Sequence, residues 1–572
     1  MSHASETTES HQEDHPAWIT RLGSLTGSAT AEASPVCNLK GLTFAVKDNI
    51  DVQGIRTTAG CEAFAYTPNQ HAEVVHKLLA AGASLKGKTN LDQFACGLNG
   101  TRSPWGAVPN AFDSRYVSGG SSSGSAYVVA TGQVDFSLGT DTAGSGRVPA
   151  GLNNIVGLKP TKGLISARGV VPAAQSVDCV SIFARSVGLA VKVLQAAMGE
   201  DLHDPYSRQV TLNTSPLPEN FRFGVPDSLE FFGDADSQKA FAHAIQKMSS
   251  LGGTPVKVNF LAFAQAAELL YESAMVAERY EAIRDFYDAH EQHIIEPVRT
   301  IIGRGAQYSA ADLYRAQTKL KALEKKAQAV WRDIDVMLVP TAPTHYTIEA
   351  MQADPIALNR NLGAYTNFVN LLDYAALSVP SSLRDDGLPF GITLIGPAGS
   401  DLQLADLGQR YHLQSGMTQG ATGLPLPSAS VILPARSENS TLVAVVGAHL
   451  SGMPLNHQLT DRGAKWVEAA HTSADYRLYA LPHTTPPKPG LLRVAKGQGH
   501  PIAIEIWEIP LTQYGSFVSL IAARLGIGSL TLADGRQVQG FLCEPYALEG
   551  AQDITSLGGW RNYLKTLSPV SV

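Results

Sequence analysis

Apolar and polar positions alternate in blocks along the first 415 residues of the chain. Short apolar runs such as GLTFAVKD and ASLKGK are typical of strands, and HAEVVHKLLAAG between them has the periodicity of an amphipathic helix. Further strand-like runs follow in IDVMLVPTAPT, NFVNLLDYAALSVPSS and GLPFGITLIGP. Because strands alternate with helices, the pattern predicts an α/β layer architecture, in which a central mixed sheet is covered by helices.

Several other segments have a pattern that predicts a particular element. Residues 15–22 are expected to form a first short helix, residues 261–290 a long helix of strong helix formers, and residues 401–414 another helix. The apolar runs at residues 126–130 and 134–138 look strand-like. Together these elements fill one large domain, which we expect to span residues 16–415.

The pattern changes after residue 415. Residues 416–440 are rich in Gly, Pro, Ser and Thr and lack periodicity, so they are expected to form a linker. Residues 441–572 contain short β-like runs, among them LVAVVGAHL and PIAIEIWEI, and few helical segments. We therefore expect a second, small α+β domain of barrel-like form over residues 441–572.

Composition excludes several classes of function. The 572 residues are 44% hydrophobic and 17% charged, with a formal net charge of −7 and no basic stretch suited to nucleic acid. No run of about 18 apolar residues occurs, and the polar start at residues 1–15 lacks a signal-like apolar region. The five cysteines are scattered without a CxxC pair. These observations predict a cytoplasmic protein with reduced thiols and no membrane segment.

Residues 82–89, GASLKGKT, match the pattern of a nucleotide-binding phosphate loop. Such a loop must follow a strand and open a helix, so that the helix N-terminus faces the phosphate. Here Gly82 ends a predicted helix and a loop-rich segment follows Thr89. The context therefore argues against nucleotide binding.

Two serine clusters and one lysine carry the candidate chemistry. Ser121 lies in GGSSSG and Ser145 in DTAGSGR, 24 residues apart, with apolar segments between them that attach both clusters to a buried scaffold. Lys47 ends the apolar run LTFAVK, at the edge of a predicted core. Burial lowers the pKa of an amine, so Lys47 could act as the base that a serine nucleophile needs.

These motifs, LTFAVKDNI, GGSSSGSA and DTAGSGRVPA, together resemble the amidase signature family of Ser-Ser-Lys hydrolases. The resemblance implies a triad of Lys47, Ser121 and Ser145, with Ser145 as nucleophile and Ser121 passing its proton to neutral Lys47. It also implies a cis peptide between Gly120 and Ser121. Arg147 and Asp178 are expected to be scaffold groups rather than catalytic ones.

An oxyanion site is expected in the same motif as the nucleophile. Backbone N–H groups of Thr142, Ala143, Gly144 and Ser145 would converge on one point, as donors must to stabilise a developing oxyanion. The family often has glycine at the position of Ala143. This departure is mild, because alanine keeps the N–H group.

Two further segments bear on the substrate. In the family, the loop TNLDQFACGLNGTRSPWG lines the acyl pocket, which makes Gly97 a candidate backbone contact, although a plain turn glycine is an equal alternative. Together with LYESAMVAERY, this loop resembles one branch of the family, the allophanate hydrolases. The resemblance implies that Tyr271 and Arg279 hold the substrate, although a core Tyr and a surface Arg are the alternative. A guanidinium suits a planar carboxylate, which it binds in bidentate fashion.

The segment VVGAHLSGMPLNHQL resembles the opening strand and loop of the γ-glutamyl cyclotransferase-like fold, a domain that allophanate hydrolases commonly carry at the C-terminus. Candidate functional residues here are His457, which we prefer, and Glu505, with the alternatives His449, His483 and His500. No pair of them has the spacing of metal ligands on one helix, so no metal site is expected.

The expected function is hydrolysis of the terminal amide of allophanate, with the C-terminal domain assisting decarboxylation of the N-carboxycarbamate product. The alternatives are a general amidase, the glutaminase subunit of a tRNA amidotransferase, and an inactive amidase-fold scaffold. No cofactor is expected. The expected partners are the small-molecule substrate, a second copy in a homodimer, and a functional link to a urea carboxylase or to a cyanuric-acid or biuret pathway enzyme.

Overall fold

The computed structural model describes residues 15–26, 38–214, 216–433, 440–533 and 535–567. Residues 1–14 and Cys37 lie outside these ranges. The chain forms two compact units, residues 1–433 and residues 434–572, each with its own hydrophobic core. No described helix has both the length and the apolar composition needed to cross a membrane.

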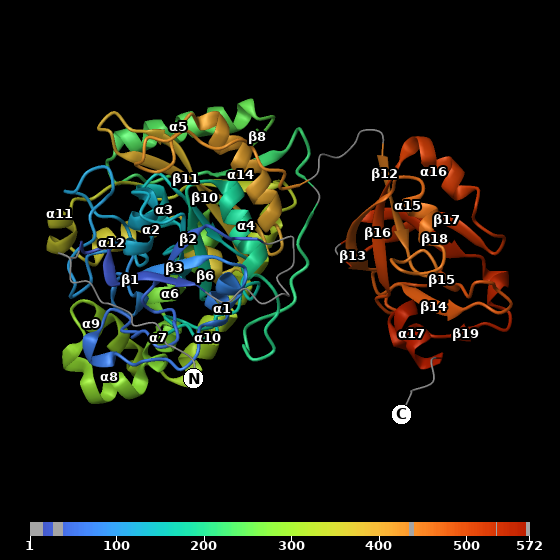
Figure 1. Ribbon diagram of the computed structural model, residues 1–572, viewed down its shortest axis with the longest axis horizontal. Helices are drawn as coiled ribbons and strands as arrows, with labels where there is room; N and C mark the ends of the chain where they lie inside the picture. Colours follow the sequence, from blue (N-terminus) through green and yellow to red (C-terminus); the bar gives the residue numbers. More distant parts are fainter. Residues whose placement is uncertain (1–14, 27–37, 215, 434–439, 534, 568–572) are drawn as a thin grey trace. The chain divides into compact units, whose positions relative to one another are not determined.

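The first unit is built on one eleven-stranded mixed sheet (Figure 1). Its strands are β1 (Trp18–Thr26), β2 (Thr43–Lys47), β3 (Ser84–Thr89), β4 (Phe136–Asp141), β5 (Val156–Lys159), β6 (Cys179–Ala184), β7 (Arg222–Pro226), β8 (Thr254–Val258), β9 (Val336–Pro340), β10 (Tyr374–Leu383) and β11 (Pro389–Pro397). Their order is β1-β3-β2-β4-β6-β5-β10-β11-β9-β7-β8; neighbours within β3-β2-β4 and within β9-β7-β8 pair parallel, and all the other neighbours pair antiparallel. The predicted mixed α/β sheet is therefore confirmed.

Helices cover both faces of this sheet. They are α1 (Glu73–Ala80), α2 (Ser123–Ala130), α3 (Val148–Leu152), α4 (Val187–Ala197), α5 (Ala235–Ser250), α6 (Leu261–Glu272), α7 (Ala277–Glu281), α8 (Arg284–His290), α9 (Val298–Gly303), α10 (Ala310–Val330), α11 (Ile348–Ala353), α12 (Ala357–Leu362), α13 (Phe368–Leu371) and α14 (Asp401–Ser415). Helices α1, α4, α5 and α14 share one apolar cluster, and α6, α10 and α13 share another. The predicted helix at residues 401–414 is confirmed.

Alternation along β10 shows how the sheet separates these two clusters. Ala375, Leu377 and Val379 belong to the cluster on the α14 side, whereas Tyr374 and Ala376 belong to the cluster on the α6 side. Successive strand residues point to opposite faces, so a continuous apolar run is what a sheet covered on both sides requires.

Two local predictions were wrong. Residues 15–22 do not form a helix, because Trp18–Thr26 is strand β1, which pairs antiparallel with β3 at the edge of the sheet. Residues 126–130 do not form a strand but lie in helix α2, nearly all of whose residues are buried. A short apolar run buried all round has no polar face, so periodicity cannot distinguish its helical form from a strand.

The long helix predicted over residues 261–290 is broken. Helix α6 ends at Glu272, and Ser273 adopts an extended backbone with φ −139° and ψ 178°. The Ser273 hydroxyl accepts a hydrogen bond from the Met275 N–H and caps the short turn that leads into α7. Ser favours such caps because its side chain competes with helical backbone bonds. The chain therefore changes direction between Tyr271 and Arg279.

The second unit contains two small sheets, a five-stranded one of order β13-β16-β12-β18-β17 and a three-stranded one of order β15-β14-β19. Its elements are β12 (Ser440–Val445), α15 (His457–Thr460), β13 (Lys465–His471), β14 (Tyr476–Ala480), β15 (Pro489–Arg493), β16 (Ala503–Pro510), α16 (Leu511–Val518), β17 (Leu525–Thr531), β18 (Gln537–Cys543), β19 (Gln552–Asp553) and α17 (Trp560–Leu567). The predicted α+β class is confirmed, and most of the predicted apolar runs coincide with these strands.

The segment expected as a linker is attached to the first unit over much of its length. Asn154 Nδ2 donates to Thr418 O and Gly420 O, and Gln409 and Ser430 exchange two hydrogen bonds. The boundary between the compact units accordingly falls after Leu433. Residues 434–439 lie outside the described ranges.

Most of the phosphate-loop-like segment at residues 82–89 forms strand β3 (Ser84–Thr89). Lys88 on β3 is fully buried, its Nζ lies 3.0 Å from Asp48 Oδ1, and it donates hydrogen bonds to Thr57 Oγ1 and Arg56 O. The lysine that would bind phosphate is therefore occupied by the protein's own groups, which agrees with the sequence argument against nucleotide binding.

We expect Lys88→Ala to destabilise the first unit by about 3 to 5 kcal/mol, because removing one partner of a buried ion pair leaves an uncompensated charge on Asp48. Denaturant unfolding of the full chain would measure this change. Lys86→Ala, on the same strand with an exposed contact to Gly23 O, is the matched control and should change stability by less than about 1 kcal/mol. Equal losses for the two variants would contradict the prediction.

Candidate active site

Lys47 and Ser121 meet at the carboxyl end of β2. Lys47 is fully buried, and its Nζ lies 2.7 Å from Ser121 Oγ and 2.7 Å from Thr140 Oγ1. Thr140 comes from β4, the strand that pairs with β2 on the side away from β3. Sequence reasoning missed Thr140, although its place beside the DTAGSGR motif on a strand was the available signal. The sheet thus brings the lysine to one of the two predicted serines.

Burial lowers the pKa of Lys47 to about 7, because the enclosed amine loses the water that stabilises its charge. The carboxylates of Asp92, Asp178 and Asp141 oppose this shift, and the Arg279 guanidinium adds to it. Near neutral pH a large fraction of the Lys47 amine is therefore uncharged and able to accept a proton.

Ser145 lies just before helix α3 and is buried. Its Oγ donates to Gly97 O at 3.4 Å, and no described hydrogen bond joins it to Ser121. The peptide between Gly120 and Ser121 is cis, as the family resemblance implied. The structure thus shows the Lys47–Ser121 half of the predicted triad, while the Ser121–Ser145 half stays a prediction.

The backbone around Ser145 offers donors for an oxyanion, but Gly144 is not among them. The Gly144 N–H donates to Asp141 Oδ1 at 2.9 Å, so this member of the predicted set points to a carboxylate. Within the described part of the chain, the N–H groups of Thr142, Ala143 and Ser145 donate to no protein acceptor. These three remain candidates for the oxyanion site.

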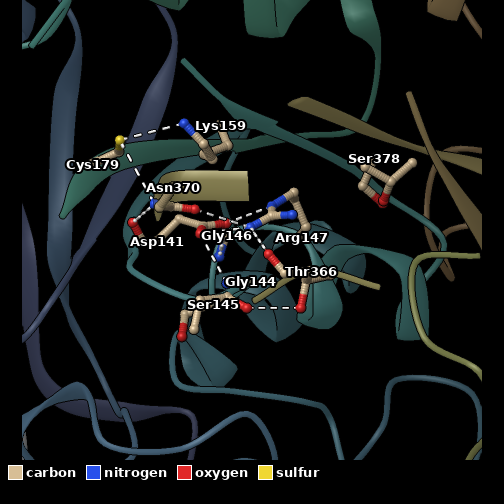
Figure 2. A network of polar contacts seen from close by, with 12 residues as sticks. Asp141, Gly144, Ser145, Gly146, Arg147, Lys159, Cys179, Thr366, Asn370 and Ser378 are labelled. Atoms are coloured by element: carbon tan, nitrogen blue, oxygen red, sulfur yellow. Dashed lines mark hydrogen bonds and ion pairs between the residues drawn. The ribbon is translucent and has the colours of Figure 1, made fainter. Parts of the chain in front are cut away.

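A buried ion pair holds this turn in place (Figure 2). Arg147 Nε and Nη2 donate to the two oxygens of Asp141 at 2.8 and 2.9 Å, and both side chains are inaccessible to solvent. Asn370 Nδ2 donates to Asp141 O, and Thr366 Oγ1 donates to Ala143 O, both at 2.7 Å. Bidentate pairing fixes orientation as well as distance, which suits the expected scaffold role of Arg147.

Gly144 is required at its position for steric reasons. Its φ is 128°, and an added Cβ would lie 2.3 Å from Thr366 Oγ1. Any other residue would push Thr366 away from Ala143 O and distort the turn that carries Ser145.

The loop that carries Gly97 is organised by Asp92, which sequence reasoning missed. Asp92 is buried, and its carboxylate accepts the backbone N–H groups of Asn99, Gly100 and Arg102 at 3.0 to 3.2 Å. The loop curls around this one side chain and presents Gly97 O to Ser145 Oγ. The carbonyl oxygen of Gly97 thus contacts Ser145, while the predicted contact of Gly97 with the substrate stays a prediction.

Arg279 and Tyr271 lie together because of the break after α6. Arg279 Nη2 donates to Tyr271 Oη at 3.2 Å, and the guanidinium carbon lies 5.0 Å from the ring centroid. Only 3% of Arg279 is exposed, yet its Nε and Nη1 have no protein partner. A buried guanidinium with unpaired donors is costly unless a ligand completes its hydrogen bonds. The predicted alternative of a surface arginine is therefore wrong.

Asp178 connects the site to a neighbouring loop. Its Oδ1 accepts the Thr142 hydroxyl at 2.5 Å, and its Oδ2 accepts the Ala173 N–H at 2.8 Å. Burial raises the pKa of Asp178 to about 6, and these hydrogen bonds and Arg279 partly offset the rise. Asp178 is therefore charged above about pH 6.

In the second unit, the preferred residue of the sequence argument lies on the surface. His457 is exposed, and its Nδ1 lies 2.9 Å from Pro454 O. Glu505 is held by the Ser451 N–H and hydroxyl, Trp507 Nε1 and Arg561 Nη2. Neither residue lines the cavity that Val446, Gly447 and Leu455 border in this unit.

His449 does line that cavity, together with Lys488, Ala448 and Phe541. Its ring stacks on Phe541 with centroids 5.1 Å apart, and its Nε2 lies 2.9 Å from Gln458 Oε1. Burial lowers the pKa of His449, so the imidazole is neutral near pH 7. Among the described residues, no group of three His, Cys, Asp or Glu side chains is arranged to hold a metal ion.

A mixed α/β sheet that carries a buried lysine beside two serine loops places the first unit in the amidohydrolase class. Comparison with known protein families agrees, because residues 3–405 match the family described as Amidase and residues 441–565 match the Allophanate hydrolase C-terminal domain. The chain belongs to the amidase family, in which it combines an amidase signature fold with this C-terminal domain.

Two relatives illustrate how far the similarity extends. A urea amidolyase of Lachancea kluyveri is 42% identical over 584 residues, covering 97% of this chain and 31% of the relative. A glutamyl-tRNA(Gln) amidotransferase subunit from Haloarcula marismortui is 33% identical over 66% of this chain and 96% of the relative. The chain spans about a third of the length of the urea amidolyases that it matches.

A solved structure of Kluyveromyces lactis allophanate hydrolase is similar over both units. It is 43% identical, with a TM-score of 0.68, and the match covers 93% of this chain and 89% of the other. The fold and the domain combination expected from the sequence are thereby confirmed.

We expect the rate of amide hydrolysis to rise with pH through about 7 and to level off above about 8. The folded-state pKa of Lys47 is about 7, so the amine is protonated and inactive below this pH and neutral above it. A pH–rate profile of kcat/KM measures the effect. Lys47→Ala should lose nearly all activity at every pH, because no other base among the described residues contacts Ser121. A flat profile of the parent enzyme from pH 6 to 9 would contradict the assignment.

Proposed function

We propose that this protein is an allophanate hydrolase, which removes the terminal amide of allophanate as ammonia. The observation that supports the proposal best is the buried Arg279 guanidinium, whose Nε and Nη1 have no protein partner. The guanidinium lies close enough to Lys47 for its charge to lower the pKa of that amine. A small substrate with a carboxylate at one end and an amide at the other can satisfy Arg279 and reach Ser145 together.

In the proposed mechanism, neutral Lys47 accepts the proton of Ser121, and Ser121 accepts the proton of Ser145. Ser145 Oγ turns from Gly97 O and attacks the terminal carbonyl carbon of the substrate. The N–H groups of Thr142, Ala143 and Ser145 stabilise the oxyanion. The C–N bond then breaks, and the proton held by Lys47 returns through Ser121 alone to the leaving nitrogen, so that ammonia departs and Ser145 Oγ stays bonded to the acyl carbon.

The same groups hydrolyse the acyl-enzyme, with water as the attacking group and Ser145 as the leaving group. A water molecule loses a proton to Ser121 and Lys47 and attacks the acyl carbon, and Ser145 regains its proton as it leaves. The product is N-carboxycarbamate. Among the described contacts, the 2.7 Å Lys47–Ser121 distance supports this relay, and it argues against an inactive scaffold.

Arg279 and the second unit favour this function over a glutaminase subunit or a general amidase. The amidotransferase relative matches 66% of this chain, whereas the allophanate hydrolase structure matches 93%. A general amidase would not require a buried guanidinium whose Nε and Nη1 have no protein partner. Both observations favour a small carboxylate-bearing substrate over glutamine or simple amides, and an assay of ammonia release from all three would separate the possibilities.

Arg279→Ala should lose about 2 to 5 kcal/mol of transition-state stabilisation for allophanate, since the substrate carboxylate would then lack its buried partner. Biuret, which has an amide in place of the carboxylate, should lose much less. The measurement is kcat/KM for both compounds. Arg284→Ala, a nearby exposed arginine paired with Glu281, is the control and should leave both values unchanged. Equal losses for the two compounds would place the carboxylate elsewhere.

For the second unit we propose assistance in the decarboxylation of N-carboxycarbamate. The structure supports a site at the His449 cavity rather than at His457, because a neutral imidazole and the Lys488 ammonium line the same pocket. A cationic group can hold a carboxylate, and an imidazole can donate or accept the proton that replaces carbon dioxide.

A chain that ends at Leu433 should keep the first ammonia release, because the whole sheet and Lys47, Ser121, Ser145 and Arg279 belong to the first compact unit. It should release carbon dioxide more slowly than the full-length protein. Adding residues 434–572 should restore the faster release, whereas the same fragment with His449→Ala should not. The fragment with His457→Ala is the matched control. A full-length time course from the truncated chain would overturn the assignment.

The supply of substrate is part of the proposal. Relatives of this chain carry the name urea amidolyase and are about three times as long. We propose that a carboxylating enzyme acting on urea provides allophanate to this protein; a cyanuric-acid or biuret pathway is the alternative source.

A further inference from the structure

Residues 173–178, which we call the connecting loop, lie between the oxyanion residues and helix α7. At one end of the loop, Asp178 accepts the hydroxyl of Thr142 at 2.5 Å. The same carboxylate accepts the N–H groups of Ala173 and Ala174, so it clamps both ends of the loop together. The position of Thr142 therefore depends on the position of this loop.

The other side of the connecting loop is attached to α7. Glu278 Oε1 accepts the Ser176 N–H at 2.6 Å, and Glu278 Oε2 accepts the Ser176 hydroxyl at 2.7 Å. Charge-assisted hydrogen bonds of this kind are short and about twice as strong as neutral ones. Glu278 immediately precedes Arg279, so the helix that carries the buried guanidinium also holds the loop.

Apolar contacts also join the oxyanion residues to the connecting loop. Ala143 belongs to a buried cluster with Ala174 and Val177 of the connecting loop and Leu270 of α6. In this chain the Ala143 methyl group joins the oxyanion backbone to the loop.

Packing supports the connecting loop on one side only, where Ala174 and Val177 belong to the apolar cluster. Gln175, Ser176 and Asp178 line a cavity of about 290 Å³, which also borders Lys162 and Asp373. A loop with a cavity on its outer side depends on its hydrogen bonds for its position. The Glu278 contacts therefore matter more here than they would in a filled core.

We propose that the connecting loop is a positioning element, which Glu278 fixes on the arginine-bearing helix and which in turn fixes Thr142 and Ala143 for oxyanion binding. Glu278, Ser176 and Asp178 are positioning residues, since they act through the backbone of the oxyanion site. The proposal rests on the proposed function for the role of Arg279, but the effect on the oxyanion site applies to any amide that Ser145 attacks.

This role differs measurably from simple support of Arg279. If Glu278 only oriented Arg279, its loss would raise KM for allophanate and leave biuret unaffected. If Glu278 positions the oxyanion donors, its loss lowers kcat for both compounds, because those donors stabilise the transition state rather than the bound substrate.

The test compares Glu278→Ala, Glu278→Gln and the control Glu281→Ala in the full-length enzyme, with allophanate and biuret as substrates. Glu281 is on the same helix but pairs with exposed Arg284. We expect Glu278→Ala to lower kcat roughly ten- to hundredfold for both compounds, the scale of a small misplacement of catalytic groups, with KM within about twofold. Glu278→Gln should recover most of kcat, because its carbonyl oxygen still accepts the Ser176 N–H.

A double variant tests whether Glu278 acts through Thr142. Thr142→Val removes the hydroxyl bonded to Asp178, so combining it with Glu278→Ala should cost less than the product of the two separate losses. Ser176→Ala, which removes only one hydrogen bond, gives a milder loss of kcat and serves if Glu278→Ala does not fold.

Three results would overturn the proposal: unchanged kcat for both compounds, a loss confined to KM for allophanate, or fully multiplicative losses in the double variant. If the parent enzyme hydrolyses biuret but not allophanate, the proposed function fails, while the same comparison on biuret still decides the role of the connecting loop.

Discussion

The chemistry of this protein depends on keeping one lysine amine out of water. Lys47 ends strand β2, and its Nζ contacts the hydroxyl groups of Ser121 and of Thr140 on β4, so the amine has hydrogen-bond partners without a neutralising carboxylate in contact. Three aspartates lie near enough to raise the pKa of Lys47, yet burial outweighs them. Had one of these carboxylates contacted Nζ directly, the lysine would remain charged and could not serve as a base.

The surrounding aspartates avoid that contact because each is occupied by other donors. Asp141 is paired with Arg147, Asp92 accepts backbone N–H groups of its own loop, and Asp178 accepts the Thr142 hydroxyl. Each carboxylate thereby orders a segment of backbone around the site. The same three aspartates therefore both order the backbone around the site and raise the pKa of Lys47.

Short sequence patterns predicted those site residues whose roles follow from their immediate neighbours in the sequence. Lys47 ends an apolar strand and the serines occupy glycine-rich turns, so these residues could be identified without a structure. Thr140 and Asp92 were missed because their roles arise from contacts with segments remote in sequence. Helix α2 was assigned the wrong type because a short apolar run takes its form from its neighbours. Strand β1 was assigned the wrong type because its form depends on pairing with β3 at the edge of the sheet.

Arg279 illustrates a different limit of prediction from the sequence. The sequence predicted one continuous helix over residues 261–290, whereas the extended backbone of Ser273 breaks that helix and Tyr271 and Arg279 meet across the break. A single capping serine decided this geometry, and residue propensities summed over the segment did not reveal it. Similarly, exposure rather than residue type separates His449 from His457.

The charge of Arg279 also makes proton binding and carboxylate binding interdependent. This guanidinium lowers the pKa of Lys47, so a carboxylate that neutralised Arg279 would make the lysine more basic. By thermodynamic reciprocity, protonated Lys47 would then strengthen the binding of that carboxylate. Tight ground-state binding of the carboxylate would therefore favour the protonated form of Lys47, whereas catalysis requires the neutral form. The carboxylate must bind weakly enough for Lys47 to stay unprotonated.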